Sequence, residues 1–242
     1  MEESSQVAFE DGLLPRLPGR LLQRAFFEAS PERVAPWLIG KLLVSRSENY
    51  PTLWLAGRIV EAEAYLGPHN QPPDPAAHSY RGPTPRNRVL FGPAGHAYVY
   101  SIYGRYFCMN ISCEIEGRAG CVLLRALEPM AGAEQMALNR GLMAGATPRQ
   151  PTPTTKTCRW GPRELTSGPS RLCQALGLTR KAHNGLDMLD CHSPLQVRDD
   201  GYAVAEVLVT PRIGIHEAMD WPLRFALRGH ACVSGTKGLR GC

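Results

Sequence analysis

The chain has 242 residues and a formal net charge of +5, and its length allows one large domain or at most two small ones. Its 27 lysines and arginines against 22 aspartates and glutamates favour association with a polyanion without requiring it, so a merely basic protein fits the charge equally well. The acidic start MEESSQVAFEDG lacks the apolar core of a signal peptide, and no apolar run approaches the roughly 20 residues that cross a bilayer. These features predict an intracellular protein without a membrane span. Eight cysteines without a CxxC pair and seven histidines without an HExxH motif predict reduced thiols and no metal site.

The first half of the chain predicts a helix followed by two strands. Ser30 and Pro31 are typical of a helix start and Gly40 of a helix end. KLLVSRS then reads as a strand, and residues 55–66 follow with a period of two. In that second strand one face would hold Ile59, Glu61, Glu63 and Tyr65, and the other Val60, Ala62, Ala64 and Leu66. We therefore expect one face to pack and the other to carry carboxylates.

The rest of the chain predicts a mostly antiparallel sheet with few helices. Residues 67–95 form a proline-rich loop with the basic segment TPRNR, and the stretch 95–112 holds a hairpin that turns at Tyr103-Gly104-Arg105. Further strands are expected at 120–129, 205–215 and 222–229, helices at 132–143 and from Ser167, and a mobile loop at 147–162. The pattern predicts an α+β fold, with a curved sheet, surrounding helices and a protruding hairpin in one domain at 19–233. Residues 1–18 and 234–242 are expected to be flexible.

Three features suggest chemistry, each with a plainer alternative. Glu61 and Glu63 on one strand face repel each other, so they need a task or a basic partner, although a solvated face with salt bridges would also explain them. Tyr65 on the same face favours a task, because an aromatic ring beside a carboxylate can hold a flat substrate against a general base. Arg125 lies within the apolar run VLLRAL and needs a counter-charge or an anionic ligand. The S-x-x-K match from Ser234 lacks its partner motifs and is read as chance.

The hairpin tip is unusual because an aromatic residue is followed there by a cation. Hairpin tips normally carry Asn, Asp or Gly, so Tyr103 and Arg105 suit contact with a partner that has flat faces and negative charge. By themselves, His78 fits an ordinary loop histidine and the PRNR cluster fits solvated charge.

Several sequence blocks in order resemble the alkyladenine DNA glycosylase family, also called 3-methyladenine DNA glycosylases. The blocks are RIVEAEAYLGP, AAHS, TPRNR, YVYSIYGRYFCMNIS, CVLLRALEP and SGPSRLCQAL, with later counterparts in TPRIGI and WPLRFALRG. The resemblance implies a monofunctional enzyme without lyase activity, metal or other cofactor. Such an enzyme flips an alkylated or deaminated purine, such as 3-methyladenine, out of double-stranded DNA and hydrolyses its N-glycosidic bond. It would act as a monomer in base excision repair, in the cytoplasm or nucleoid of a bacterium or in the nucleus of a eukaryote.

The resemblance also assigns roles to residues by position. Glu63 would be the catalytic base, and the base pocket would be formed by Tyr65, His78, Tyr100 and Asn110. Tyr103 would enter the minor groove, Arg125 would bind near the target nucleotide, and DNA would also be bound by Arg86, Arg88 and Arg105. Two departures are visible. The segment between Tyr65 and His78 is longer and richer in proline than is usual, and Arg105 stands where the family often has methionine.

Two other functions remain open on the residues alone. A non-catalytic nucleic-acid binder would use the same aromatic and basic residues without needing Glu63. A hydrolase of small molecules would use Glu63 and leave the arginines solvated, and salt-sensitive binding to duplex DNA would argue against it. The preference among 3-methyladenine, 7-methylguanine, hypoxanthine and ethenoadenine is not predicted.

Overall fold

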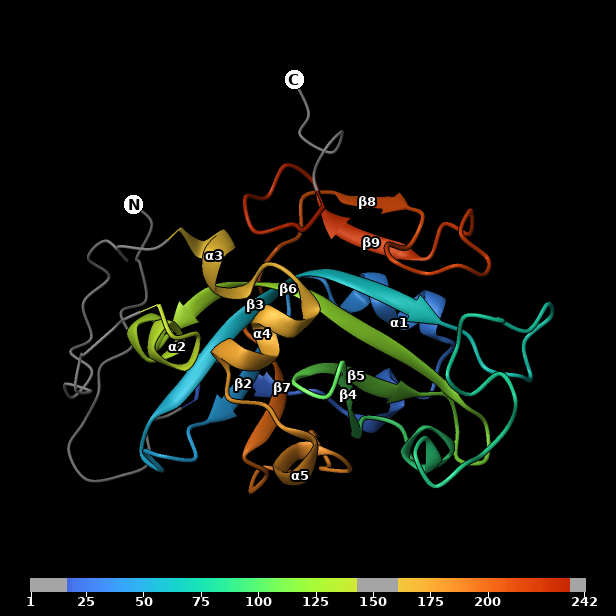
Figure 1. Ribbon diagram of the computed structural model, residues 1–242, viewed down its shortest axis with the longest axis horizontal. Helices are drawn as coiled ribbons and strands as arrows, with labels where there is room; N and C mark the ends of the chain where they lie inside the picture. The colour runs from blue at the N-terminus through green and yellow to red at the C-terminus, as the bar shows by residue number, and fades with distance from the viewer. Residues whose placement is uncertain (1–16, 143–160, 236–242) are drawn as a thin grey trace.

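The computed structural model describes residues 17–142 and 161–235, and a single antiparallel sheet organises them (Figure 1). The sheet has nine strands, in the order β1-β7-β2-β3-β6-β5-β4, while β9 pairs with both β3 and β8. The strands are β1 (Arg20–Leu21), β2 (Leu42–Arg46), β3 (Trp54–Tyr65), β4 (Ala97–Ile102), β5 (Tyr106–Cys113), β6 (Gly120–Ala131), β7 (Leu195–Asp199), β8 (Val207–Thr210) and β9 (Arg224–Leu227). The expected α+β fold with a curved antiparallel sheet is confirmed. The predicted mobile loop lies outside the described residues except at its last two positions, and so do most of the two predicted flexible ends.

Short helices surround the sheet. They are α1 (Pro31–Leu38), α2 (Ala133–Asn139), α3 (Pro162–Thr166), α4 (Pro169–Ala175) and α5 (Arg180–His183), with 3-10 turns η1 (Arg24–Phe26) and η2 (Arg88–Phe91). Helix α1 begins at the predicted Pro31 and packs on β3 and β6, while α4 packs on β5 and β6. Among the described residues, no helix has the length and apolarity needed to cross a bilayer.

Strand β3 differs from its prediction because both of its faces are buried. Ten consecutive residues of the strand are buried, including Glu61 and Glu63, so neither face is solvated. The pairing of β3 with β6 shifts register on either side of Glu61. Such an irregularity breaks the period of two. Ile59 accordingly belongs to the main apolar core with Ala62 and Ala64, and its predicted grouping with Glu61 is wrong. The long β3 and β6 strands still cross the whole molecule as the frame of the site (Figure 1).

Gly67 lets the chain leave β3 close to the start of β6. A Cβ atom at this position would lie 1.5 Å from the carbonyl oxygen of Ala119, so no other residue fits without backbone movement. The close approach fixes the direction of the chain two residues after Tyr65, where the proline-rich loop begins.

The β4–β5 hairpin turns at the predicted residues. Tyr103 at its tip is 91% exposed and has a φ of 50°, a left-handed conformation that is costly for a residue with a side chain. The hairpin therefore presents a strained tyrosine to solvent.

Candidate active site

The register of the sheet brings the predicted site residues onto one face. Glu63 lies opposite Leu123 of β6, Leu123 lies opposite Asn110 of β5, and Asn110 lies opposite Tyr98 of β4. Directly opposed residues in antiparallel strands point to the same face. Residues two positions along share that face, which adds Tyr65 and Tyr100. Site residues from strands β3, β4 and β5 thus converge, although they are up to about fifty positions apart in the chain.

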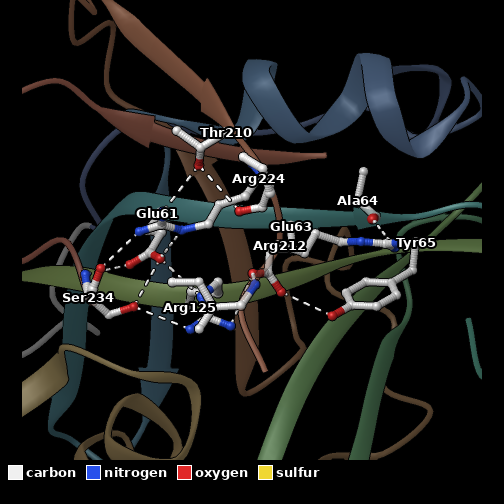
Figure 2. A network of polar contacts seen from close by, with 11 residues as sticks. Glu61, Glu63, Ala64, Tyr65, Arg125, Thr210, Arg212, Arg224 and Ser234 are labelled. Carbon is white, nitrogen blue, oxygen red and sulfur yellow. Dashed lines mark hydrogen bonds and ion pairs between the residues drawn. The ribbon is translucent and has the colours of Figure 1, made fainter. Parts of the chain in front are cut away.

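Glu63 is fully buried, and its carboxylate contacts three polar donor groups. Its Oε2 accepts a hydrogen bond from the Tyr65 hydroxyl at 3.0 Å, and its Oε1 accepts one from the Ile213 backbone N–H at 2.8 Å. The Nη1 of Arg125 lies 3.2 Å from Oε1 (Figure 2). The carboxylate is therefore held from two sides, with an aromatic ring adjacent to it.

Glu61 is more completely engaged than Glu63. Its Oε1 accepts from Arg224 Nε at 2.7 Å, Arg125 Nε at 3.0 Å and Ser234 Oγ at 2.9 Å, and its Oε2 accepts from the Ser234 backbone N–H at 2.6 Å. Figure 2 shows these side chains gathered around the Glu61 carboxylate. Glu61 therefore ties β3, β6, β9 and the segment at Ser234 together, which is a structural task.

Arg125 bridges the two carboxylates. Burial lowers the pKa of its guanidinium, but Glu63 and Glu61 raise it by more, so the net shift of the pKa is upward. The counter-charge that the sequence required for Arg125 is thus supplied within the chain. Its contact with DNA stays a prediction.

Three tyrosines and a histidine form an aromatic cluster beside Glu63. The rings of His78 and Tyr100 meet edge to face with centroids 4.5 Å apart, and His78 Nδ1 lies 3.0 Å from the Tyr98 hydroxyl. Tyr65 and Tyr100 are half-buried, whereas Tyr98 is buried. The cluster therefore offers aromatic surface next to a carboxylate, an arrangement that suits a flat substrate.

The shifts in pKa favour the neutral forms of these side chains near pH 7. Burial, followed by the Glu63 carboxylate, raises the pKa of Tyr65, and burial raises the pKa of Tyr98 to about 12. Partial desolvation, followed by the Arg86 guanidinium, lowers the pKa of His78, although part of this residue reaches solvent.

Asn110 is held in place by bonds to neighbouring strands. It is buried, its Nδ2 donates to the Tyr98 carbonyl at 3.2 Å, and its Oδ1 lies 3.6 Å from the Cys121 thiol, which donates to it. The carboxamide therefore has a defined orientation on the face that carries Glu63.

The predicted DNA-binding residues occupy different places. The Arg86 guanidinium lies 5.5 Å from the Tyr100 ring centroid, so Arg86 belongs to the rim of the aromatic cluster. Arg88 is exposed at the start of η2, and Arg105 is exposed at the hairpin tip beside Tyr103. Within the described residues, Arg88 and Arg105 form no ion pair.

The sequence did not single out several residues that complete the site. Tyr98 could have been found, because it lies two positions from Tyr100 and so shares its face. Arg224 stands in an apolar strand in the same way as Arg125 does. The S-x-x-K match at Ser234 does not point to this role, and the residue stands at the start of the tail expected to be flexible, yet it is buried and bonded to Glu61.

Among the described residues, one group has the side-chain types of a metal site. Asp190, Cys191 and His192 lie close together, but all three are exposed and consecutive in one turn. No further feature marks this group as a metal site.

The fold and the site define a recognised class of protein. The family model for methylpurine-DNA glycosylases matches residues 25–231. The chain belongs to the methylpurine-DNA glycosylase family, which confirms the resemblance seen in the sequence.

Relatives from several organisms match nearly the whole chain, and each carries the name "Putative 3-methyladenine DNA glycosylase". The protein from Koribacter versatilis is 48% identical over 218 residues, which cover 90% of this chain and 95% of the relative. The protein from Methanoculleus marisnigri is 45% identical over 217 residues (88% and 98%), and one from Rhodopseudomonas palustris is 45% identical over 224 residues (93% and 92%).

Proposed function

We propose that this protein is a DNA glycosylase that extrudes an alkylated or deaminated purine from duplex DNA and hydrolyses its N-glycosidic bond. The observation that carries the proposal is the buried Glu63 carboxylate, bonded to the Tyr65 hydroxyl at the edge of an aromatic cluster. Membership of the methylpurine-DNA glycosylase family supports it.

Extrusion is needed because the glycosidic carbon of a stacked purine is inaccessible in duplex DNA. Tyr103 at the hairpin tip would enter the minor groove and fill the space that the extruded nucleotide leaves. The extruded base would stack against Tyr65, His78 and Tyr100. An alkylated purine that carries positive charge would bind these electron-rich rings more strongly than a neutral base.

Bond cleavage would use Glu63 and water. The bond from the sugar C1′ to the purine nitrogen breaks, its electron pair leaves with the base, and positive charge develops on the sugar. The Glu63 carboxylate stabilises that charge and takes a proton from the water whose oxygen bonds to C1′. Because the nucleophile is water, the product is an abasic site in an unbroken strand, and the enzyme is monofunctional.

The remaining predicted residues would bind DNA around this centre. Arg86, Arg88 and Arg105 would contact phosphates and Arg125 would lie near the target nucleotide, while Asn110 would select the base. The enzyme would act as a monomer. The enzyme would work where the cell keeps its DNA, in the nucleoid of a bacterium or the nucleus of a eukaryote.

The test uses duplexes that each carry one defined lesion: 7-methylguanine, hypoxanthine or ethenoadenine. The wild-type protein should create sites that break only after heating in alkali. Failure with every lesion would contradict glycosylase activity and favour a non-catalytic binder, while strand breaks without alkali would contradict the monofunctional assignment.

The matched variant is Glu63→Gln, which keeps the shape of the side chain but cannot accept the proton. The single-turnover rate should fall by roughly two decades or more, while binding to lesion DNA persists. Base release at the wild-type rate would show that Glu61 or another group is the base.

A further inference from the structure

A fully buried ion pair lies behind the aromatic cluster and joins three segments of the chain. Arg212 Nη2 donates to Asp74 Oδ1 at 2.9 Å, and neither side chain has any exposed surface. Arg212 Nη1 also donates to the Ala64 carbonyl at 3.0 Å, and Asp74 accepts from the Leu66 N–H at 3.1 Å. The pair therefore fastens the end of β3, the proline-rich loop and the segment after β8 to one another.

Arg212 adjoins two of the groups that hold the Glu63 carboxylate, the Tyr65 ring and the backbone N–H of Ile213. Its guanidinium carbon lies 4.6 Å from the centroid of the Tyr65 ring, and the Tyr65 hydroxyl donates to Glu63 Oε2 (Figure 2). The backbone N–H of the next residue, Ile213, donates to Glu63 Oε1. Both oxygens of the carboxylate are thus held by groups whose positions depend on Arg212.

The form of the contact requires the planar guanidinium and not only its charge. The Nε of Arg212 is buried without a hydrogen-bond partner among the described residues, so its donors are not all satisfied. The flat group instead covers the Tyr65 ring while its fork holds Asp74, a combination that a lysine ammonium cannot reproduce. Since buried ion pairs contribute little net stability by themselves, stability alone does not explain this one.

We propose that Arg212, held by Asp74, is a positioning residue that fixes the Tyr65 ring and the Glu63 carboxylate relative to each other. This inference rests on the function proposed above for Glu63. Small errors in the position of a catalytic group are costly, since a displacement of about 1 Å can slow a reaction by about two decades.

The first test is a double-mutant cycle of Arg212→Lys and Tyr65→Phe on single-turnover base release. Arg212→Lys alone should slow release by about tenfold or more. In the Tyr65→Phe background the loss should be clearly smaller, because the hydroxyl link to Glu63 is already missing and only the link through Ile213 remains. Equal losses in both backgrounds would mean a general structural effect and would overturn the proposal.

The matched control is Arg58→Lys, since Arg58 repeats the same arrangement elsewhere in the sheet. Its Nη1 and Nη2 donate to the two carboxylate oxygens of Asp200 at 3.0 and 2.8 Å, and Nη1 also donates to the Gly40 carbonyl at 2.8 Å. Its guanidinium carbon lies 4.0 Å from the centroid of the Tyr202 ring. Arg58→Lys should lower the melting temperature and leave base release unchanged. A loss of base release equal to that of Arg212→Lys would overturn the proposal.

A second readout is independent of activity. Hydrogen exchange of the Ile213 amide, followed by NMR, should be faster in Arg212→Lys than in wild type and unchanged in Arg58→Lys. If Arg212→Lys does not fold, Asp74→Asn with Arg212→Gln removes both charges together and should give the same result. An unchanged exchange rate of the Ile213 amide in Arg212→Lys would overturn the role of Arg212. An inactive wild-type protein would instead contradict the proposed function, and the exchange rate alone would then test the role of Arg212.

Discussion

Glu61 and Glu63 lie two positions apart on one strand, yet their neighbours give them different tasks. Glu61 receives two arginines and both the side chain and the backbone N–H of Ser234. Glu63 receives one arginine, one tyrosine hydroxyl and one backbone N–H, and it borders the aromatic cluster. The first arrangement stabilises the sheet, and the second leaves a carboxylate next to a place where a substrate can stack.

Glu61→Gln should therefore destabilise the fold much more than Glu63→Gln does. The change leaves the Arg224 guanidinium buried without its carboxylate, and breaking a buried ion pair costs about 3–5 kcal/mol. Urea denaturation of the two variants beside wild type measures the difference. A Glu61→Gln protein as stable as Glu63→Gln would contradict the structural role of Glu61.

Asn110→Ser should widen the choice of base. Guanine differs from adenine and hypoxanthine by a 2-amino group, and a carboxamide held by Tyr98 and Cys121 can occupy the position of that group. The variant should release guanine lesions faster than wild type does, and it should retain part of the hypoxanthine release. Release of guanine from a G·T mismatch measures the gain. No gain, with a circular dichroism spectrum like that of wild type, would show that Asn110 is not the selective residue.

At the scale of the element, the β4–β5 hairpin combines a packed base with an exposed tip. Tyr98 is 1% exposed and Tyr103 is 91% exposed, although both are tyrosines of one hairpin. The buried end belongs to the aromatic cluster, and the strained end projects away from the sheet. The hairpin can therefore place the tip at a fixed position relative to Glu63.

Tyr103→Ala should weaken binding to lesion DNA more than binding to undamaged DNA. Unstacking a base costs a few kcal/mol, and without the ring the emptied position in the duplex stays unfilled. Phosphate contacts by Arg86, Arg88 and Arg105 would persist, so non-specific affinity should change less. Binding titrations on both duplexes measure the ratio of affinities, with Tyr50→Ala, an exposed tyrosine of another turn, as the control. If Tyr103→Ala left the ratio of the two affinities unchanged, the insertion of Tyr103 into the duplex would be contradicted.

At the scale of the whole molecule, stability should fall as the pH falls through the range of histidine titration. Burial lowers the pKa of His183 below its usual 6.5, and its Nδ1 accepts a hydrogen bond from the Thr179 backbone N–H. The unfolded chain therefore binds a proton at a higher pH than the native protein does, and protonation favours unfolding.

His183→Asn should flatten this dependence, because the amide oxygen can accept from Thr179 without titrating. The free energy of unfolding, measured in urea between about pH 7.5 and about pH 5, should decline less steeply in the variant than in wild type. His78, whose pKa is also lowered, would account for a remaining slope. Equal slopes in the two proteins would exclude His183 as a source of the pH dependence.

Much of the molecule follows from the sequence because its signals are local. Helix α1 begins at Pro31 as the Ser30-Pro31 pair predicts, and the hairpin turns at Tyr103 as expected. The order of the sequence blocks identified the family, and alternation in residues 61–65 placed Glu63 beside Tyr65. Each of these inferences uses residues that are neighbours in the chain.

Only the tertiary structure decided how the two glutamates are surrounded. Both faces of β3 are buried and its pairing with β6 is irregular, and the period of two predicted neither feature. The groups that hold Glu63 and Glu61, Ile213 and Ser234, lie 150 and 173 residues further along the chain. Periodicity reports only which face a residue occupies, whereas the donors around a buried carboxylate depend on which distant segments pack against that face. The sequence by itself thus determined the family and the candidate reacting groups, and the packing of the C-terminal segments determined the site in which they are held.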